Sequence, residues 1–290
     1  MSAAPPSSRS GPLALGLAAL ALLTDAHGYC RTTTSPAQPD PTVCPARGVP
    51  IAWPTRCGAM RLSPIERPPN LDWSVVQSAT RDAAAAWRGI DCGGGRPSGF
   101  DLEILGDVAA AAGYNVDGVN INSINFLSRW ADDAFHPPDA AAVTIVTFGA
   151  MSASILDTDT DLNLADFRFV VGADRTGADL QTILGHEMGH ALGLAHSPDR
   201  LSVMWYAVGR GEQRRAPTSD DVAGLCAVYP PRPREACDPE IRRETFYGGG
   251  LPLACTSGPR GGGSGGAAVC LGAALWLSAR RRRAALSGRR

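Results

Sequence analysis

Apolar residues recur at helical spacing in three parts of the chain. In the first, over residues 72–88, Asp72 can cap the first turn, and one face carries Val76, Ala79 or Thr80, Ala83 and Trp87. The second segment spans 179–192 and begins at a capping residue, Asp179. The third spans 219–229, and its apolar side carries Val222, Leu225, Cys226 and Tyr229. The pattern therefore predicts three helices.

Short β-branched or alternating runs predict strands, most of them in the first half of the chain. They lie at 51–63, 100–105, 118–124, 143–148 and 154–163, with a further short apolar stretch at 167–172. Strands that precede one long helix are typical of an α+β domain. The apolar and charged fractions, 44% and 19%, fit an ordinary globular protein.

Both ends of the chain have the composition of targeting segments. Residues 1–28 contain Arg9, an apolar run over 13–23 and small residues at the positions that determine cleavage, so they predict a signal peptide cut after Gly28. Such a leader predicts a bacterial protein that is either secreted or held at the cell surface or outer envelope.

The C-terminal end has three parts. A Gly-rich linker at 258–266 is followed by an apolar segment at 267–279 and an arginine cluster at 280–283. With Cys255 ahead of the linker, this order resembles the sorting signals of myxobacteria. The arginines favour a cytoplasmic position by the positive-inside rule. We therefore expect residues 267–290 to contact the membrane as part of a sorting signal. The alternative is that they form a plain C-terminal anchor.

The central part divides into a cysteine-bracketed segment at 29–50, one domain at 51–230 and a linker rich in Cys and Gly at 231–266. Between Tyr29 and Gly266, 20 arginines stand against 27 acidic residues, which gives a net charge near −7. An acidic body excludes nucleic acid as the expected partner. The chain has eight cysteines and no CxxC pair, so behind an export leader they predict disulfides.

The sequence HEMGHALGLAH at residues 186–196 carries the chemistry. His186 and His190 are four residues apart, so both side chains reach one metal ion from the same helix face. Glu187 lies beside them, within reach of a water on that ion. Gly193 is where the helix ends, because glycine adopts the positive φ of a helix C-terminus. This allows His196 to return as a third ligand.

This segment matches HExxHxxGxxH and resembles the metzincin zinc peptidases. The following segment, residues 202–206, resembles their Met-turn, in which Met204 would pack beneath the ligands. Tyr206 is similar to the tyrosine of astacins and serralysins, which implies a zinc or oxyanion contact; the alternative is a wall residue. Residues 179–181 and 218–229 are more similar to the matrixins, the family of matrix metalloproteases.

The resemblance covers about residues 50–230 and implies a twisted sheet with a long active-site helix behind a cleft. In that family an antiparallel edge strand binds the substrate, and 154–163 is our candidate for it. Asp157, Asp159 and Asp161 alternate along this strand. They predict a structural calcium site or, alternatively, charges that protect an exposed edge from aggregation.

The sequence around Cys57 is similar to the cysteine switch of matrixin propeptides, in which a thiolate occupies the zinc. Cys57 lies too close to the start of the domain for that role. We expect instead a disulfide between Cys57 and Cys92, which follows the first helix.

The predicted function is that of a secreted, monomeric zinc metalloendopeptidase that acts on proteins or peptides. Zinc would be held by His186, His190 and His196, and Glu187 would act as general base and acid. The alternative is a surface-displayed binding protein on a degenerate peptidase fold. All four residues of the motif are intact, which favours the enzyme.

Overall fold

The computed structural model describes residues 28–109, 112–116, 120–134, 136–231 and 268–271. In chain order the elements are β1 (Cys30–Arg31), β2 (Cys57–Leu62), α1 (Trp73–Trp87), β3 (Asp101–Leu105), β4 (Ser123–Leu127), the 3₁₀ turn η1 (Trp130–Asp132), β5 (Ala142–Phe148), β6 (Ile155–Asn163), β7 (Phe169–Val170), β8 (Ala178–Asp179), α2 (Leu180–Ala191), β9 (Leu194–Ala195), α3 (Ser219–Val228) and β10 (Ala268–Leu271).

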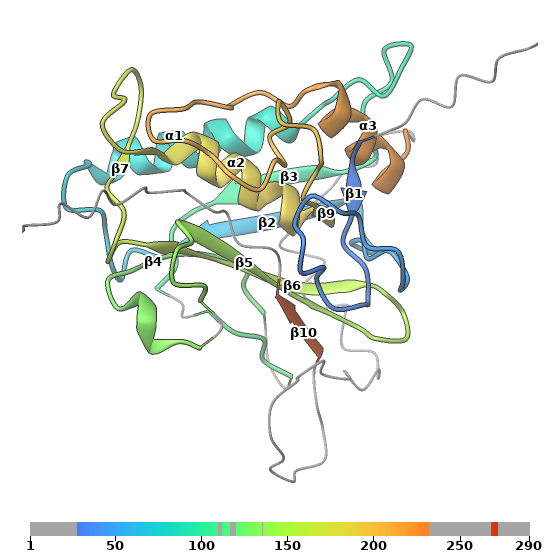
Figure 1. Ribbon diagram of the computed structural model, residues 1–290, viewed down its shortest axis with the longest axis horizontal. Coiled ribbons are helices and arrows are strands. Elements are labelled where there is room, and N and C mark those ends of the chain that lie inside the picture. The colour runs from blue at the N-terminus through green and yellow to red at the C-terminus, as the bar shows by residue number, and fades with distance from the viewer. Residues whose placement is uncertain (1–27, 110–111, 117–119, 135, 232–267, 272–290) are drawn as a thin grey trace, which may run out of the picture.

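A twisted mixed sheet carries two helices on one side (Figure 1). Its strand order is β10-β5-β6-β4-β2-β3. Strands β3, β2, β4 and β6 are parallel, whereas β5 is antiparallel to β6. Strand β10 pairs antiparallel with β5. The expected α+β architecture of a metzincin is confirmed.

Helix α1 begins and ends within one residue of its prediction, and the five residues predicted for its apolar face are all buried. That face packs on β3 and on α2. The largest buried side chains of the core include Trp87, Phe126 and Phe169. Helix α3 was predicted at the right place, but its buried face carries Asp221, Gly224 and Val228 beside Leu225, and Val222 is only half-buried.

The predicted edge strand is wrong. Strand β6, which holds the aspartates, lies inside the sheet between β5 and β4. The alternative that the three aspartates protect an exposed edge is also wrong. Each is at most 3% exposed, because side chains from β4 and from the loop after it cover that face. Strand β5 lies next to β6, is antiparallel to it, and pairs on its other side with β10.

The predicted Cys57–Cys92 disulfide is also wrong. Cys92 is bonded to Cys226 on α3, and Cys57 is disulfide-bonded as well. A disulfide-bonded Cys57 is no free thiolate, so it does not act as a cysteine switch. The loop after α1 is held against the end of α3, where Gly99 N donates to Tyr229 O. This proximity across 134 residues places Cys92 beside Cys226. A further disulfide joins Cys30 to Cys44.

The predicted leader and tail lie outside the described residues, except for Gly28 and for β10 within the apolar segment. Among the helices that the structure does describe, none combines the length and the apolar character needed to cross a membrane.

Candidate metal centre and catalytic site

Helix α2 carries the first part of the motif and is buried along almost its entire length. Its cap is the predicted one: the Asp179 carboxylate accepts a hydrogen bond from Thr182 N at 2.9 Å and pairs with Arg215. Burial raises the pKa of Asp179, but the Arg215 and Thr182 hydrogen bonds outweigh it and lower the pKa overall. The carboxylate therefore stays charged at the helix N-terminus, where a negative charge is favourable.

The helix ends at the glycine that the motif requires. Gly193 has φ +89°, and its amide donates to His190 O at 2.9 Å. A Cβ at Gly193 would lie 2.8 Å from Ile51 O, so the position excludes a side chain on two independent grounds. The chain reverses here into β9, and His196 follows immediately.

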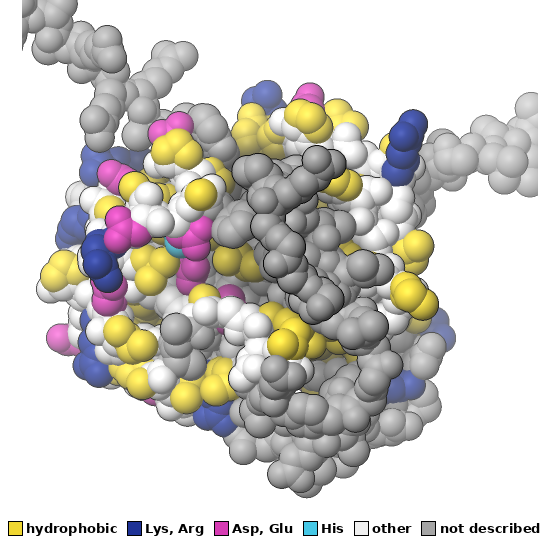
Figure 2. All heavy atoms as spheres, turned by 90° about the horizontal axis from the view of Figure 1, so that it is seen from below, with side chains coloured by type: hydrophobic (Ala, Val, Ile, Leu, Met, Phe, Trp, Pro, Cys, Tyr) yellow, Lys and Arg dark blue, Asp and Glu magenta, His cyan; other side chains and the backbone are white. Residues whose placement is uncertain are grey.

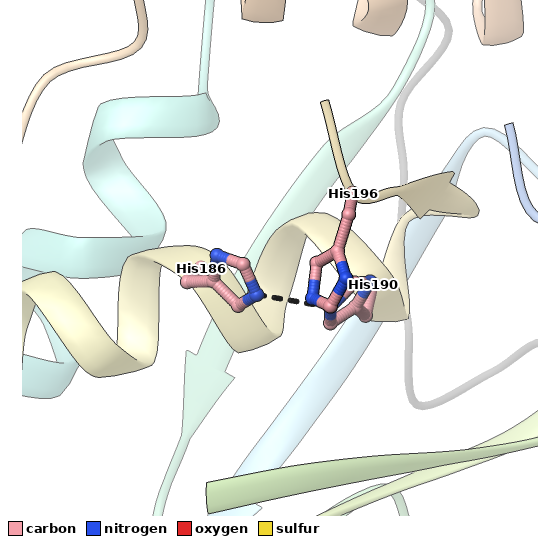
Figure 3. A group of neighbouring side chains, drawn as sticks. All are labelled: His186, His190 and His196. Carbon is pink, nitrogen blue, oxygen red and sulfur yellow. Dashed lines mark hydrogen bonds between the residues drawn. The ribbon is translucent and has the colours of Figure 1, made fainter. Parts of the chain in front are cut away.

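The three histidines converge (Figure 3). Their ligand atoms lie within 4.8 Å of one another, the only such group of three metal-binding side chains found among the described residues. His186 Nε2 lies 3.0 Å from His190 Nε2. Two nitrogens on a tetrahedral zinc ion lie about 3.3 Å apart, given Zn–N bonds of about 2.0–2.1 Å. The spacing is therefore close to that of a zinc site.

The hydrogen bonds behind the rings determine which nitrogen faces the site. His186 Nδ1 contacts Val203 O at 2.7 Å, and His190 Nδ1 contacts Leu194 O at 2.9 Å. A carbonyl only accepts, so each Nδ1 carries the proton and each Nε2 presents a lone pair. Both ring nitrogens of His196 are buried with no hydrogen-bond partner among the described residues. Nitrogen lone pairs that face one another with no proton between them can bind a cation. Three imidazoles in this arrangement are typical ligands of zinc.

Burial keeps the three rings neutral. Burial lowers the pKa of His190 to about 4, and it lowers the pKa of His186 and of His196 well below the usual value. For His186 and His196 the neighbouring histidines lower the pKa further. Neutral imidazole is the form that binds a metal ion.

Glu187 lies on the same helix and is fully buried. Its Oε2 accepts a hydrogen bond from Thr144 Oγ1 of β5 at 2.7 Å, and Thr144 is bonded in turn to Thr160 of β6 at 2.9 Å. Its Oε1 has no partner within the described part of the chain. Burial raises the pKa of Glu187 to about 8, against the opposing effect of the Thr144 hydrogen bond. One oxygen is thus held, and the other is free for a water.

The Met-turn lies directly beneath α2. Met204 is buried, and a Cβ placed on Gly189, between the two helical ligands, would collide with Met204 Sδ. The turn is held from α3 by Asp221, which accepts hydrogen bonds from Ser202 Oγ and from Val203 N. Val203 in turn supplies the carbonyl behind His186. Sequence analysis missed Asp221, which doubles as the partner of Thr218 in a capping box.

Tyr206 lies on the same side as the third ligand. Its ring centroid is 6.1 Å from that of His196, and the side chain is half-buried. The position fits a residue beside the metal, but no hydrogen bond links Tyr206 to the histidines among the described contacts.

The opposite face of the sheet holds a second buried polar group, which sequence analysis missed. His136 Nε2 lies 3.0 Å from Asp161 Oδ2, and its ring stacks on Trp130 at 4.1 Å. His136 and Asp161 border a cavity of about 430 Å³ that also has Glu66, Asp132 and Asp133 in its wall. Figure 2 shows a hollow with a histidine among acidic side chains on this face. The signal in the sequence was a histidine six residues after a tryptophan.

The comparisons with known proteins fall on the same region. Residues 115–230 match the family model described as Matrixin. This segment is therefore similar to the matrixins. Matrixins are zinc metalloendopeptidases, so the family agrees with the histidine triad.

Proteins similar to this segment come from plants and animals. The chain is 36% identical over 67 residues to Metalloendoproteinase 1-MMP of Arabidopsis thaliana, which covers 23% of this chain and 18% of that protein. It is 36% identical over 94 residues to human Matrix metalloproteinase-27, covering 26% and 18%. It is also 34% identical over 104 residues to human Matrix metalloproteinase-20, covering 35% and 21%. The chain thus spans about a fifth of the length of these relatives.

Proposed function

We propose that the protein is a zinc-dependent endopeptidase that hydrolyses peptide bonds in protein or peptide substrates. One observation carries the proposal: three buried imidazoles converge, with no proton between the two helical ones, beside a carboxylate oxygen that has no partner among the described residues. Zinc held by His186, His190 and His196 would make a water nucleophilic near neutral pH and polarise the scissile carbonyl.

The protein's own residues would move the proton. Glu187 Oε1 accepts a proton from the attacking water, while Thr144 holds Oε2 in place. Glu187 then delivers that proton to the leaving amine. A buried carboxyl with a pKa near 8 is suited to both steps, because it exchanges a proton readily near neutral pH. The carbonyls of Val203 and Leu194 fix the orientation of the two helical imidazoles throughout.

We propose further that Tyr206 steadies the developing oxyanion. Its place next to His196 supports this role. In a Tyr206→Phe variant the loss should fall on kcat with KM little changed, as for an interaction made only in the transition state. An unchanged kcat would leave Tyr206 as a wall residue.

The direct test of the function is a zinc and activity measurement on the purified protein. We expect about one zinc per chain by elemental analysis, and cleavage of casein or a quenched peptide that a chelator abolishes. His190→Ala should lose both the metal and the activity. Full zinc occupancy in His190→Ala would contradict the ligand set. Zinc binding without cleavage of any peptide in a library would favour the alternative, a binding protein on a peptidase fold.

We also propose that the protein is exported and held at the envelope of a bacterium. The described disulfides support an oxidising compartment. Deletion of residues 267–290 should release soluble, active protein, because every site residue precedes residue 231. Mass spectrometry of the mature protein separates a processed sorting signal, which is absent, from an anchor, which is retained. A soluble mature protein with an intact tail would contradict both.

A structural calcium ion at the aspartates of β6 remains a separate proposal. Carboxylate oxygens are the ligands that calcium prefers. Asp159 already accepts hydrogen bonds from Ser123 and Gly113, however, and Asp161 is bonded to Asn125 and His136. The test is thermal unfolding with added calcium or EGTA, and an unchanged Tm would remove calcium from this site.

A further inference from the structure

The segment at residues 29–50 contacts the turn that separates the second and third ligands. Strand β1 pairs antiparallel with β9, so that Cys30 lies opposite Ala195 and Arg31 opposite Leu194. Thr32 N donates to Gly193 O at 2.9 Å. The segment thus runs along the whole turn between His190 and His196.

One carbonyl connects this segment to the metal centre. Leu194 O accepts a hydrogen bond from His190 Nδ1 at 2.9 Å and another from Thr32 Oγ1 at 3.0 Å. A carbonyl oxygen has two lone pairs, so both bonds are made at once. Thr32 therefore holds the group that orients a zinc ligand.

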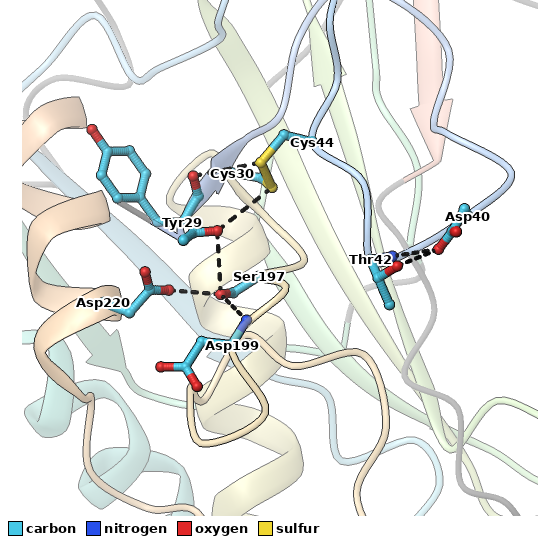
Figure 4. Close-up of a disulfide and its surroundings, with 9 residues drawn as sticks. Tyr29, Cys30, Asp40, Thr42, Cys44, Ser197, Asp199 and Asp220 are labelled. Carbon is cyan, nitrogen blue, oxygen red and sulfur yellow. Dashed lines mark hydrogen bonds between the residues drawn. A yellow bond between two sulfur atoms is a disulfide. The ribbon is translucent and has the colours of Figure 1, made fainter. Parts of the chain in front are cut away.

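The segment is itself held at its base. The Cys30–Cys44 disulfide closes it into a loop next to β1, as Figure 4 shows. On the far side of His196, Ser197 Oγ donates to Asp220 on α3 at 2.6 Å and accepts from Asp199 N at 3.0 Å. The third ligand thus lies between two braced segments, of which only the second belongs to the region matched by the family model.

We infer that Thr32 is a positioning residue for the metal centre, and that the disulfide-closed segment at 29–50 holds residues 193–195 where His190 and His196 meet the ion. The inference rests on the proposed function for its metal, but the brace itself is a property of the protein without metal. Groups that orient a ligand by hydrogen bonding typically change metal affinity by about 10- to 100-fold when they are removed.

The test compares three variants of the full chain. Thr32→Val removes the hydroxyl but keeps the branched shape, Thr32→Ser keeps the hydroxyl, and Thr33→Val is the matched control. Thr33 Oγ1 donates to Arg47 O at 2.8 Å, so the control loses a hydroxyl–carbonyl bond in the same segment that does not reach β9. Zinc affinity is measured by competition with a chromophoric chelator.

We expect zinc to bind Thr32→Val about tenfold more weakly than wild type, whereas Thr32→Ser and Thr33→Val bind within about twofold. Thr32→Val with wild-type affinity would overturn the inference, and so would an equal loss in Thr33→Val. If Thr32→Val does not fold, the Cys30→Ser/Cys44→Ser double variant replaces it. It should release zinc to the chelator several-fold faster than wild type, and an unchanged rate would overturn the inference.

Hydrogen exchange on the metal-free protein separates this inference from the proposed function. Backbone amides of residues 193–195 should exchange faster in Thr32→Val than in wild type or Thr33→Val. Equal exchange rates in Thr32→Val and wild type would show that Thr32 does not hold this turn, whether or not zinc binds. A wild-type protein that binds no zinc would contradict the proposed function, while the exchange result would still decide whether Thr32 holds the turn.

Discussion

The two faces of strand β6 carry buried polar side chains of opposite kinds. On the face toward α2, Thr160 leads through Thr144 to Glu187 and the histidines, and several of these atoms have no partner in the described structure. On the other face, Asp159 and Asp161 are bonded to their neighbours. Asp157 Oδ1 has no partner among the described residues, but burial and the nearby Asp159 charge raise the pKa of Asp157 to about 9, which favours its neutral form.

The difference separates a chemical site from a structural one. A buried polar atom without a partner costs free energy, so a cluster of such atoms indicates a missing ligand. A group whose bonds are already made indicates stability. The acidic row looked to sequence analysis like a metal site, and the contacts of its members favour a structural role.

The largest effect should come from the α2 side. Glu187→Gln should lower kcat by at least about 10²-fold, because acid–base catalysis needs the ionisable carboxyl. The zinc content should stay near that of wild type, since Glu187 is not a ligand. Measurement of kcat and of bound zinc on the same preparation checks both. Near-normal turnover would remove Glu187 from the mechanism.

A substitution on the other face of β6, which carries Asp161, should lower the stability of the fold. His136→Ala removes the buried partner of Asp161 and should lower the free energy of unfolding by about 3–5 kcal/mol. Zinc stoichiometry should not change. The control is Arg129→Ala in the same loop, where both partners of the Arg129–Asp132 pair are exposed, so little change is expected. Loss of zinc in a folded His136→Ala variant would contradict the assignment of a structural role to this face.

A smaller effect should follow from Thr144→Val. Loss of the hydrogen bond to Glu187 should lower kcat by about tenfold, which corresponds to a bond of about 1.4 kcal/mol. Thr158→Val is the control, because the Thr158 hydroxyl is buried without a partner among the described residues. Steady-state kinetics on both variants decides the matter, and equal kcat values would leave Thr144 a packing residue.

The smallest effect concerns pH. Burial lowers the pKa of His136, but the Asp161 hydrogen bond and the Trp130 carbonyl outweigh it, so the folded pKa is raised. Stability from the charged ring is therefore complete below about pH 6.5, the unfolded value, and is lost as the pH rises through the folded pKa. The difference in unfolding free energy between wild type and Asp161→Asn should shrink across that window. A difference independent of pH would show that the ring does not titrate there.

The local sequence pattern was enough to predict the features that depend on residues close together in the sequence, namely the helices and the histidine motif. The three helices follow from spacing, and α2 also follows from its Asp179 cap, whereas Asp72 makes no side-chain cap hydrogen bond at the start of α1. The motif residues meet because 186, 190 and 196 lie on one helix or just after its terminating glycine. Thr144 and Thr32 were not predicted, because each reaches the site across more than 40 residues.

The position of β6, the partner of Cys92 and the role of His136 were not predicted correctly, because they depend on how distant segments of the chain are arranged. Whether β6 lies at the edge or inside depends on β5 folding back antiparallel beside it, which no local pattern states. Likewise, Cys92 has its partner on α3 because the chain returns there after the whole sheet is built. His136 was not predicted as part of a polar group, because its partner is 25 residues away on β6.

The Cys92–Cys226 disulfide has a consequence for the proposed endopeptidase. It encloses the sheet strands β3 to β6, α2 and the Met-turn within one covalent loop. A single self-inflicted cut anywhere in that loop leaves both fragments joined, so the two halves of the active site stay attached to each other. Autolysis would thus produce a nicked molecule of unchanged mass but for one water, visible as two fragments only after reduction.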